Sequence, residues 1–132
     1  MFVFAIAVLF ALNAAVAQIT ISLWPELSKA RSASQEVDTT KSSDDLVAGK
    51  RVARITGVTN PTLTIYPPRA GKNSEAAVVV FPGGGYSILA LDLEGTEVCD
   101  WLTSEGVTCV LLKYRVPDSG PYPEHKEALA DA

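Results

Sequence analysis

The sequence predicts an α/β fold in which antiparallel edge strands lead into a parallel sheet with crossover helices. Two continuous apolar runs, residues 76–81 and 107–114, are typical of strands buried on both faces of a parallel sheet. Residues 93–105 lie between them and have helical spacing of their apolar positions. A strand, a helix and a strand in this order form a right-handed parallel crossover, and this unit decides the fold class.

The segments before this unit are predicted to be extended or irregular. Residues 19–24 suit a short edge strand, and residues 29–50 are polar without a period, which indicates a surface loop. Residues 51–58 and 62–66 both alternate polar and apolar side chains, as half-buried strands do, and Asn60-Pro61 breaks the chain between them. We expect these two strands to pair antiparallel at the edge of the sheet.

The crossover helix is predicted from Val98, Trp101 and Leu102, which fall at helical spacing and place Trp101 in the core. Gly106 supplies the left-handed stop at its end. We expect residues 107–114 to form an exposed sheet edge. A second helix is predicted to begin near Glu124.

The most informative stretch follows the first apolar run: Pro82, three glycines and Tyr86. Three consecutive residues without Cβ atoms allow backbone N–H groups to point at a bound atom. Chemistry that produces an oxyanion needs such donors. The alternative is a glycine-rich turn that only leaves a buried strand. The position at the carboxyl end of a parallel strand, where ligands of such sheets bind, favours the catalytic interpretation.

Pro82-Gly83-Gly84-Gly85-Tyr86 resembles the oxyanion loop of α/β-hydrolase esterases, with Pro82 in place of the more common histidine. It is most similar to the secreted carbohydrate-esterase, acetylxylan-esterase-like branch of that superfamily. Four other segments match that branch in order: Leu23-Trp24-Pro25, Thr59-Asn60-Pro61-Thr62-Leu63-Thr64-Ile65-Tyr66, Glu94-Gly95 and Leu112-Lys113-Tyr114-Arg115-Val116-Pro117.

The resemblance implies an α/β-hydrolase fold and a serine esterase that acts on acylated carbohydrate. It assigns Gly84 and Gly85 as oxyanion-hole residues that act through their backbone N–H groups. Tyr86 lines an acyl or sugar pocket, or is a packed loop aromatic. Two alternatives stay open for the function: a peptidase of the same fold, and a secreted binding module without catalysis.

The nucleophile that this superfamily requires is missing. No Gly-x-Ser-x-Gly is present, and neither Ser87 nor Ser104 has glycines on both sides at that spacing. His125 lies among charged residues, as on a solvated helix face, and it precedes the missing serine, whereas the superfamily order is serine, acid, histidine. We therefore expect the 132-residue chain to be the amino-terminal, inactive part of a longer enzyme, cut before its nucleophile.

Three regions are predicted along the chain: a signal peptide at residues 1–17, an extended lead-in and polar loop at 18–50, and the amino-terminal part of the hydrolase domain at 51–132. Ala15 and Ala17 form an Ala-x-Ala cleavage site behind an apolar run that is too short to span a membrane. The protein is therefore expected to be secreted or periplasmic, with an amino-terminal membrane anchor as the alternative.

Charge and composition argue against nucleic acid as a partner and against a metal site or a cofactor. Eleven basic and fifteen acidic residues give a net charge of −4, with no basic cluster for nucleic acid. One histidine and two cysteines offer no metal-site spacing, and no cofactor is predicted. Cys99 and Cys109 could form a disulfide in an exported protein, or both could be small buried apolar residues, which the apolar run around Cys109 favours. Arg115 and Asp118 flank Pro117 and are interpreted as a structural brace.

Overall fold

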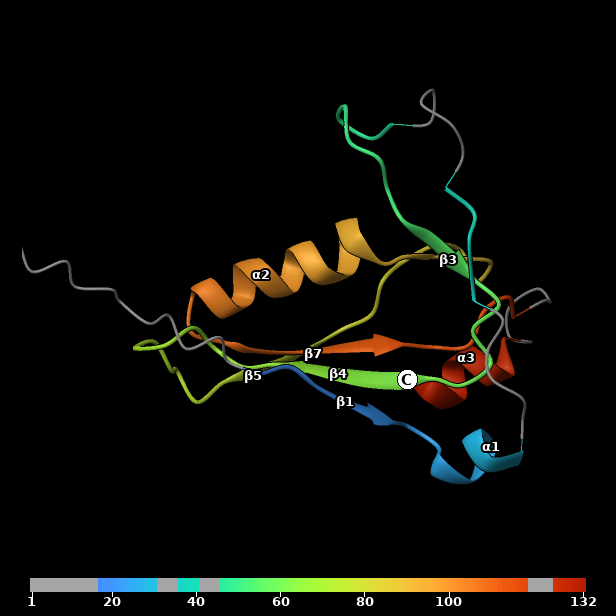
Figure 1. Ribbon diagram of the computed structural model, residues 1–132, viewed down its shortest axis with the longest axis horizontal. Coiled ribbons are helices and arrows are strands. Elements are labelled where there is room, and N and C mark those ends of the chain that lie inside the picture. Colours follow the sequence, from blue (N-terminus) through green and yellow to red (C-terminus); the bar gives the residue numbers. More distant parts are fainter. Residues whose placement is uncertain (1–16, 31–35, 41–45, 119–124) are drawn as a thin grey trace, which may run out of the picture.

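The computed structural model describes residues 17–30, 36–40, 46–118 and 125–132. These residues form a mixed α/β fold with two sheets (Figure 1). The predicted signal peptide lies outside the described residues except for Ala17. Within the described ranges, no helix is both long and apolar enough to cross a membrane.

The main sheet contains four strands in the order β1-β4-β7-β5. These are β1 (Ile19–Ser22), β4 (Thr62–Tyr66), β7 (Thr108–Lys113) and β5 (Ala77–Val80). Strands β1 and β7 pair antiparallel with β4, whereas β5 pairs parallel with β7. The edge strand β1 and the parallel pair of the crossover unit are thus confirmed.

A second sheet contains three short strands, β2 (Val37–Asp38), β3 (Arg54–Thr56) and β6 (Leu89–Ala90), with β3 in the middle. Strand β3 pairs antiparallel with β2 and β6. The predicted pairing of β3 with β4 is therefore wrong. Both edges of β4 are occupied by β1 and β7, so β3 has no edge of β4 to join. Strand β2 also gives the predicted polar loop some regular structure.

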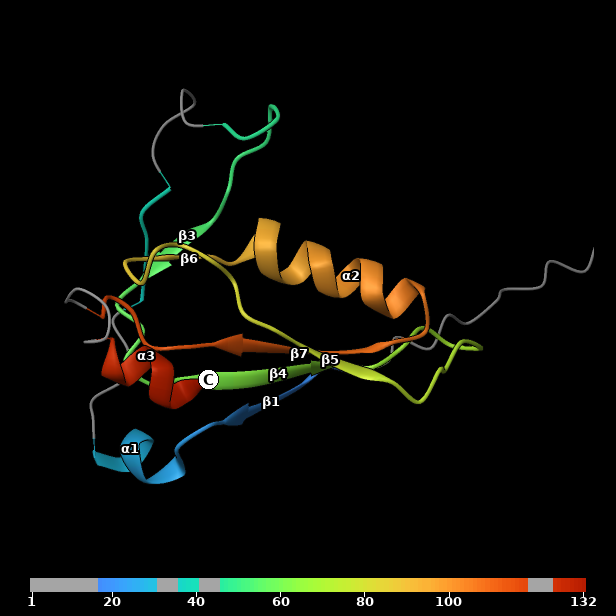
Figure 2. The same cartoon turned by 180° about the vertical axis from the view of Figure 1, so that it is seen from behind.

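The crossover helix consists of a π-helical turn, η1 (Asp92–Thr96), followed by α2 (Glu97–Ser104). Figures 1 and 2 show α2 along one face of the main sheet. The helix buries Cys99, Leu102 and Thr103, whereas Trp101 is 63% exposed, so its predicted place in the core is wrong. At about 100° per residue, Trp101 points about 200° away from Cys99 and therefore away from the sheet. Gly106, with φ 86°, provides the predicted stop.

Strand β5 is more open than its sequence predicts. Val78, Val79 and the following Phe81 are 41%, 49% and 47% exposed, so burial on both faces is wrong for this strand. Strand β7 also does not form the expected exposed edge, because it lies between β4 and β5. The sheet edge falls on β5, which has a neighbour on one side only among the described strands.

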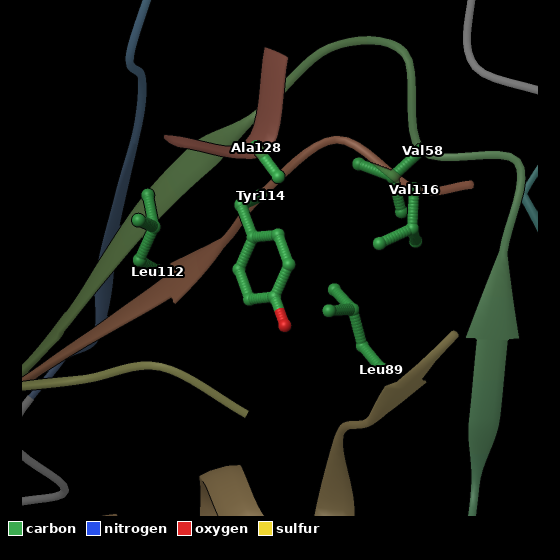
Figure 3. Packing of buried hydrophobic residues seen from close by; sticks show 6 residues of the cluster. All are labelled: Val58, Leu89, Leu112, Tyr114, Val116 and Ala128. Carbon is green, nitrogen blue, oxygen red and sulfur yellow. The ribbon is translucent and has the colours of Figure 1, made fainter. Parts of the chain in front are cut away.

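Two clusters of buried side chains form the core. The first gathers residues from both sheets and from α3 (Lys126–Asp131), and Figure 3 shows the ring of Tyr114 within it, with the hydroxyl at the end remote from Ala128. Its buried members are Val58, Leu89, Leu112, Tyr114, Val116 and Ala128. The second lies between α2 and the sheet and consists of Val80, Cys99, Leu102, Cys109 and Leu111.

Cys99 and Cys109 are joined by a disulfide that ties α2 to β7. Both residues are fully buried, and their Cα atoms are 5.2 Å apart. The sequence favours two unlinked buried cysteines, and the structure contradicts this: the cysteines are buried but bonded, and the bond lies inside the second core cluster. The remaining helix, α1 (Pro25–Ala30), follows β1 and lies on the side of the main sheet away from α2 (Figure 1).

Candidate functional site

The glycine loop (residues 82–86) lies at the carboxyl end of β5, where the sequence predicts it. Gly84, Gly85 and Tyr86 have φ angles of 148°, 59° and 59°. A Cβ atom on Gly84 would overlap the carbonyl oxygen of Ile88, whereas one on Gly85 would meet nothing within 4 Å. Gly84 is therefore required by both space and φ, whereas Gly85 is favoured only by its left-handed φ, which Tyr86 also adopts.

The carbonyl groups of the loop are held by hydrogen bonds. Gly83 O accepts the Ala90 N–H at 2.9 Å, and Gly84 O accepts the amides of residues 87 and 88 at 3.2 and 3.3 Å. In a trans peptide the C=O and N–H point in opposite directions, so each bond also fixes the N–H of the next residue. Within the described part of the chain, neither the Gly84 nor the Gly85 N–H has a hydrogen-bond partner. The loop thus presents two oriented, unoccupied donors.

The peptide between Pro82 and Gly83 is held at both of its polar ends. The Tyr114 hydroxyl donates to Pro82 O at 2.6 Å, and the Gly83 N–H donates to Glu94 Oε2 at 2.9 Å. Burial raises the pKa of Tyr114, and the charges of Tyr86 and Glu94 raise it further. A raised pKa keeps the phenol protonated, which preserves the donor that Pro82 O needs.

Gly95 allows the π-helical turn to approach this peptide closely. A Cβ atom there would lie 3.0 Å from Leu111 Cδ1 and 3.2 Å from Pro82 Cγ. Gly95 and Pro82 are both buried. Glu94 therefore accepts a hydrogen bond from the Gly83 N–H, and Gly95 leaves the space in which Pro82 packs.

The far end of the loop is attached to the start of α3. Tyr86 stacks on His125, with ring centroids 4.0 Å apart and planes 12° from parallel, and Tyr86 O accepts the Asp118 N–H at 2.8 Å. The Nδ1 atom of His125 lies 2.9 Å from Asp118 O, and Asp118 Oδ2 accepts the Ala128 N–H at 2.8 Å. His125 is half-buried. The expectation of a solvated helix face is therefore wrong for His125, because Tyr86 covers its ring.

A cavity of about 370 Å³ opens beside the glycine loop. Most of its lining is apolar, and Tyr86 is part of the wall. The other lining residues are Phe81, Gly83, Gly84, Gly85, Tyr114, Ala128, Leu129 and Ala132. The two unoccupied donors therefore belong to a loop that borders a concave apolar space, the kind of place where small ligands bind.

Helix α3, which forms one wall of the cavity, is fixed by a buried ion pair. The Asp131 carboxylate accepts the Arg115 Nε at 2.9 and 3.1 Å, Nη2 at 2.8 Å and backbone N–H at 2.9 Å. It also accepts the indole N–H of Trp24 at 2.8 Å. Hydrogen bonding to Asp131 raises the pKa of Arg115. Arg115 and Asp118 thus brace the end of β7 against α3, as the sequence predicts.

The structure brings the candidate residues Gly84, Gly85 and Tyr86 together with side chains that sequence reasoning gave no role. Glu94, Tyr114 and Trp24 fall within matched segments, but their partners are 11, 32 and 107 positions away in sequence. The resemblance was the signal that could have found them, because all five matched segments lie around the loop or support the strands and helix beside it.

Ser87 and Ser104, the two serines considered as nucleophiles, both have backbone carbonyl partners. The Ser104 hydroxyl donates to Trp101 O at 2.7 Å within α2, and the Ser87 hydroxyl lies 3.4 Å from Gly85 O. Over the ranges that the structure describes, no group of three or more histidine, cysteine, aspartate or glutamate side chains could hold a metal ion.

Comparisons with known proteins show distant, partial similarity to carbohydrate esterases. No protein-family model matches the chain. It is 43% identical over 44 residues to an acetylxylan esterase from Xylanibacter ruminicola, and the match covers 33% of this chain and 9% of that protein.

A solved structure, the acetyl ester-xyloside bifunctional hydrolase from Caldicellulosiruptor lactoaceticus, aligns with a TM-score of 0.45 and 27% sequence identity. The alignment covers 74% of this chain and 32% of that one. The chain thus spans less than a third of either protein by these matches.

Proposed function

We propose that the chain is the amino-terminal part of an exported serine esterase of the α/β-hydrolase fold, and that it carries the oxyanion-hole loop. The observation that supports this most directly is the pair of unoccupied Gly84 and Gly85 amides, oriented by held carbonyls at the end of a parallel strand. Preorganised donors are what an acyl-transfer transition state requires, because they stabilise the oxyanion without reorganisation when it forms.

In this proposal a serine attacks the ester carbonyl, a histidine takes its proton, and an acid orients that histidine. The carbonyl oxygen becomes an oxyanion and accepts hydrogen bonds from the Gly84 and Gly85 N–H groups. The proposal places the serine, histidine and acid beyond residue 132. The proposal gives His125 no catalytic role, because the superfamily order places the histidine after the serine; the ring of His125 is instead stacked on Tyr86, with Nδ1 at Asp118 O.

We infer that the substrate is an ester of an acylated carbohydrate, and that Tyr86 lines the site that receives it. Tyr86 belongs to the wall of the cavity beside the loop. The 43% identity over 44 residues to a protein described as an acetylxylan esterase supports an ester over a peptide. A peptidase of the same fold and a non-catalytic binding module remain the alternatives that the experiments must separate.

The decisive experiment extends the coding sequence beyond residue 132. We expect a Gly-x-Ser-x-Gly about 25–40 residues further on, at a strand-to-helix turn. The purified longer protein should hydrolyse acetylated xylan and p-nitrophenyl acetate, and substitution of that serine by alanine should lower kcat by about 10⁴-fold or more. The 132-residue chain should show no hydrolysis above background. A longer protein without the motif, or with peptidase activity alone, would contradict the proposal.

The oxyanion assignment is tested in the same longer protein. Gly84→Val and Gly85→Val should each lower kcat by about 100-fold or more, with a smaller change in KM, because the donors act mainly in the transition state. Folded variants that keep normal turnover would show that the glycines form only a turn.

Export is part of the proposal and has its own measurement. Cleavage after Ala17 would leave Gln18 as the first residue of the mature protein. Mass spectrometry of protein secreted from a bacterial host should show the loss of residues 1–17. Intact chain in the membrane fraction would indicate an anchor instead.

A further inference from the structure

We infer that Glu94 and Tyr114 are positioning residues for the oxyanion donors, and this inference rests on the proposed function. Together they form a clamp, defined as the Glu94 carboxylate and the Tyr114 hydroxyl bound to the two ends of the Pro82–Gly83 peptide. Neither side chain touches the reacting atoms in this scheme. They act on the peptide that immediately precedes the donors.

The geometry of the clamp explains why two side chains are needed. A peptide plane can rotate about its flanking bonds as a unit, carrying its C=O in one direction and its N–H in the other. A bond to Pro82 O alone would leave only one end held. With Gly83 N–H also bonded to Glu94, the plane is held from opposite sides, and the following Gly83–Gly84 peptide then starts from a fixed orientation.

Glycine makes this restraint necessary. Residues 83 to 85 have no Cβ atoms, so their backbone dihedrals have far more freedom than those of other residues. Donors that must be oriented before the reaction cannot rely on such a backbone alone. The side chains of Glu94 and Tyr114 therefore restrain a backbone that the glycines alone would leave free to rotate.

Substitutions that remove the charge of Glu94 can show whether this residue acts through its hydrogen bond or through its charge. A carboxylate near the loop repels an oxyanion, so its charge opposes the proposed chemistry. A glutamine at this position keeps an acceptor oxygen for the Gly83 N–H and removes that repulsion. If Glu94 acts through its hydrogen bond, Glu94→Gln should preserve the loop, whereas Glu94→Ala should release it.

The experiment uses the 132-residue chain and acetate as a carboxylate probe of the donors. The amide NMR signals of Gly84 and Gly85 are followed during an acetate titration, together with their heteronuclear NOE values as a measure of order. In the wild type and in Glu94→Gln, both signals should shift with the same or tighter acetate dissociation constant. In Glu94→Ala and Tyr114→Phe, the constant should weaken by about fivefold or more, and the NOE values should fall.

Two further variants make the test specific. Gly83→Ala places a Cβ atom against Glu94 Oε2 and should break the same contact from the loop side. Glu97→Ala, at an exposed glutamate that pairs with Lys50 at 3.6 Å, is the matched control and should behave like the wild type.

The outcomes separate the clamp from the proposed function. If Glu94→Ala binds acetate as tightly as the wild type or tighter, with unchanged NOE values, the clamp is wrong and Glu94 is only a nearby charge. If Gly84 and Gly85 do not respond to acetate in the wild type although their NOE values fall in Glu94→Ala, the clamp holds but the oxyanion assignment is contradicted.

Discussion

Strand β5 and the glycine loop adjoin each other in the chain but are stabilised in different ways. The strand pairs with β7 on one side and leaves Val78 and Val79 41% and 49% exposed. The loop that follows is bonded to η1, β6, the end of β7 and the segment before α3. The order of the candidate site therefore comes from hydrogen bonds with residues 87–94, which are close in sequence, and with Tyr114, which is 32 positions away. The apolar strand that leads to the site contributes comparatively little side-chain burial.

The largest expected effect is on the buried ion pair that holds α3 beside the loop. Asp131→Ala removes the buried carboxylate partner of Arg115 and leaves that guanidinium only its pair with the half-exposed Glu127, which should lower the free energy of unfolding by about 3–5 kcal/mol. Chemical denaturation measures the change. Glu127→Ala is the control, because its 51% exposed side chain forms a surface pair that should contribute less than about 1 kcal/mol. Equal effects would show that burial of the pair is unimportant.

The next effect compares two adjacent glycines of the loop. Gly84→Ala forces a Cβ atom against Ile88 O and should cost about 3 kcal/mol. Gly85→Ala has free space and should cost only the left-handed penalty of about 1–2 kcal/mol. Thermal or urea unfolding of the two variants decides the point. A larger loss for Gly85→Ala would mean that its surroundings are tighter than the structure shows.

A comparable loss of stability is expected when the disulfide between α2 and β7 is removed. The disulfide closes a loop of sequence separation 10, so its loss in the Cys99→Ala/Cys109→Ala double variant should cost about 3 kcal/mol. We expect the acetate response of Gly84 and Gly85 to persist in the folded fraction, because the bond joins α2 to β7 away from the loop. A lost response in folded protein would show that the two regions are coupled.

A smaller effect concerns the hydroxyl that holds Pro82 O. Tyr114→Phe should cost about 1 kcal/mol near neutral pH. The pKa of Tyr114 is raised by burial, so the folded state retains its proton more strongly than the unfolded state. This contribution is complete below about pH 10 and is lost as the pH rises through the folded value. Because the pKa of Tyr66 is raised as well, the difference between wild type and variant is the quantity to measure.

The smallest effect tests the open strand. Val79→Thr, at 49% exposure, should change stability by less than about 0.5 kcal/mol and should reduce aggregation at the edge strand. Val80→Thr on the same strand, at 9% exposure, buries a hydroxyl and should cost about 1–3 kcal/mol. Light scattering and denaturation distinguish the two. Similar costs would mean that the strand is covered on both faces.

The sequence predicts best those features that depend on local pattern. The alternation in residues 62–66 matches β4 at both ends, and the helix stop at Gly106 requires only a left-handed residue. The pairing of β3 could not be predicted, because it depends on which edges of β4 are already taken. The exposure of Trp101 depends on how the helix is rotated on the sheet, which three apolar positions do not fix.

The candidate site shows the same division. A run of glycines after a strand indicates where backbone donors can lie, and the resemblance selects Gly84 and Gly85. The carboxylate and phenol at the Pro82–Gly83 peptide belong to separate elements, so their convergence is a property of the topology. Such contacts cannot be predicted from periodicity, composition or spacing.

The hydrogen bond between Trp24 and Asp131 has a consequence for the order in which the chain assembles. Its partners are 107 positions apart, and Arg115 joins them through the same carboxylate. Contacts between such distant positions form only after the intervening chain has been ordered, because closing a long loop costs entropy that nearer contacts must first offset. The α3 side of the cavity is therefore expected to form after the sheet has paired, when the Asp131 carboxylate reaches both earlier residues.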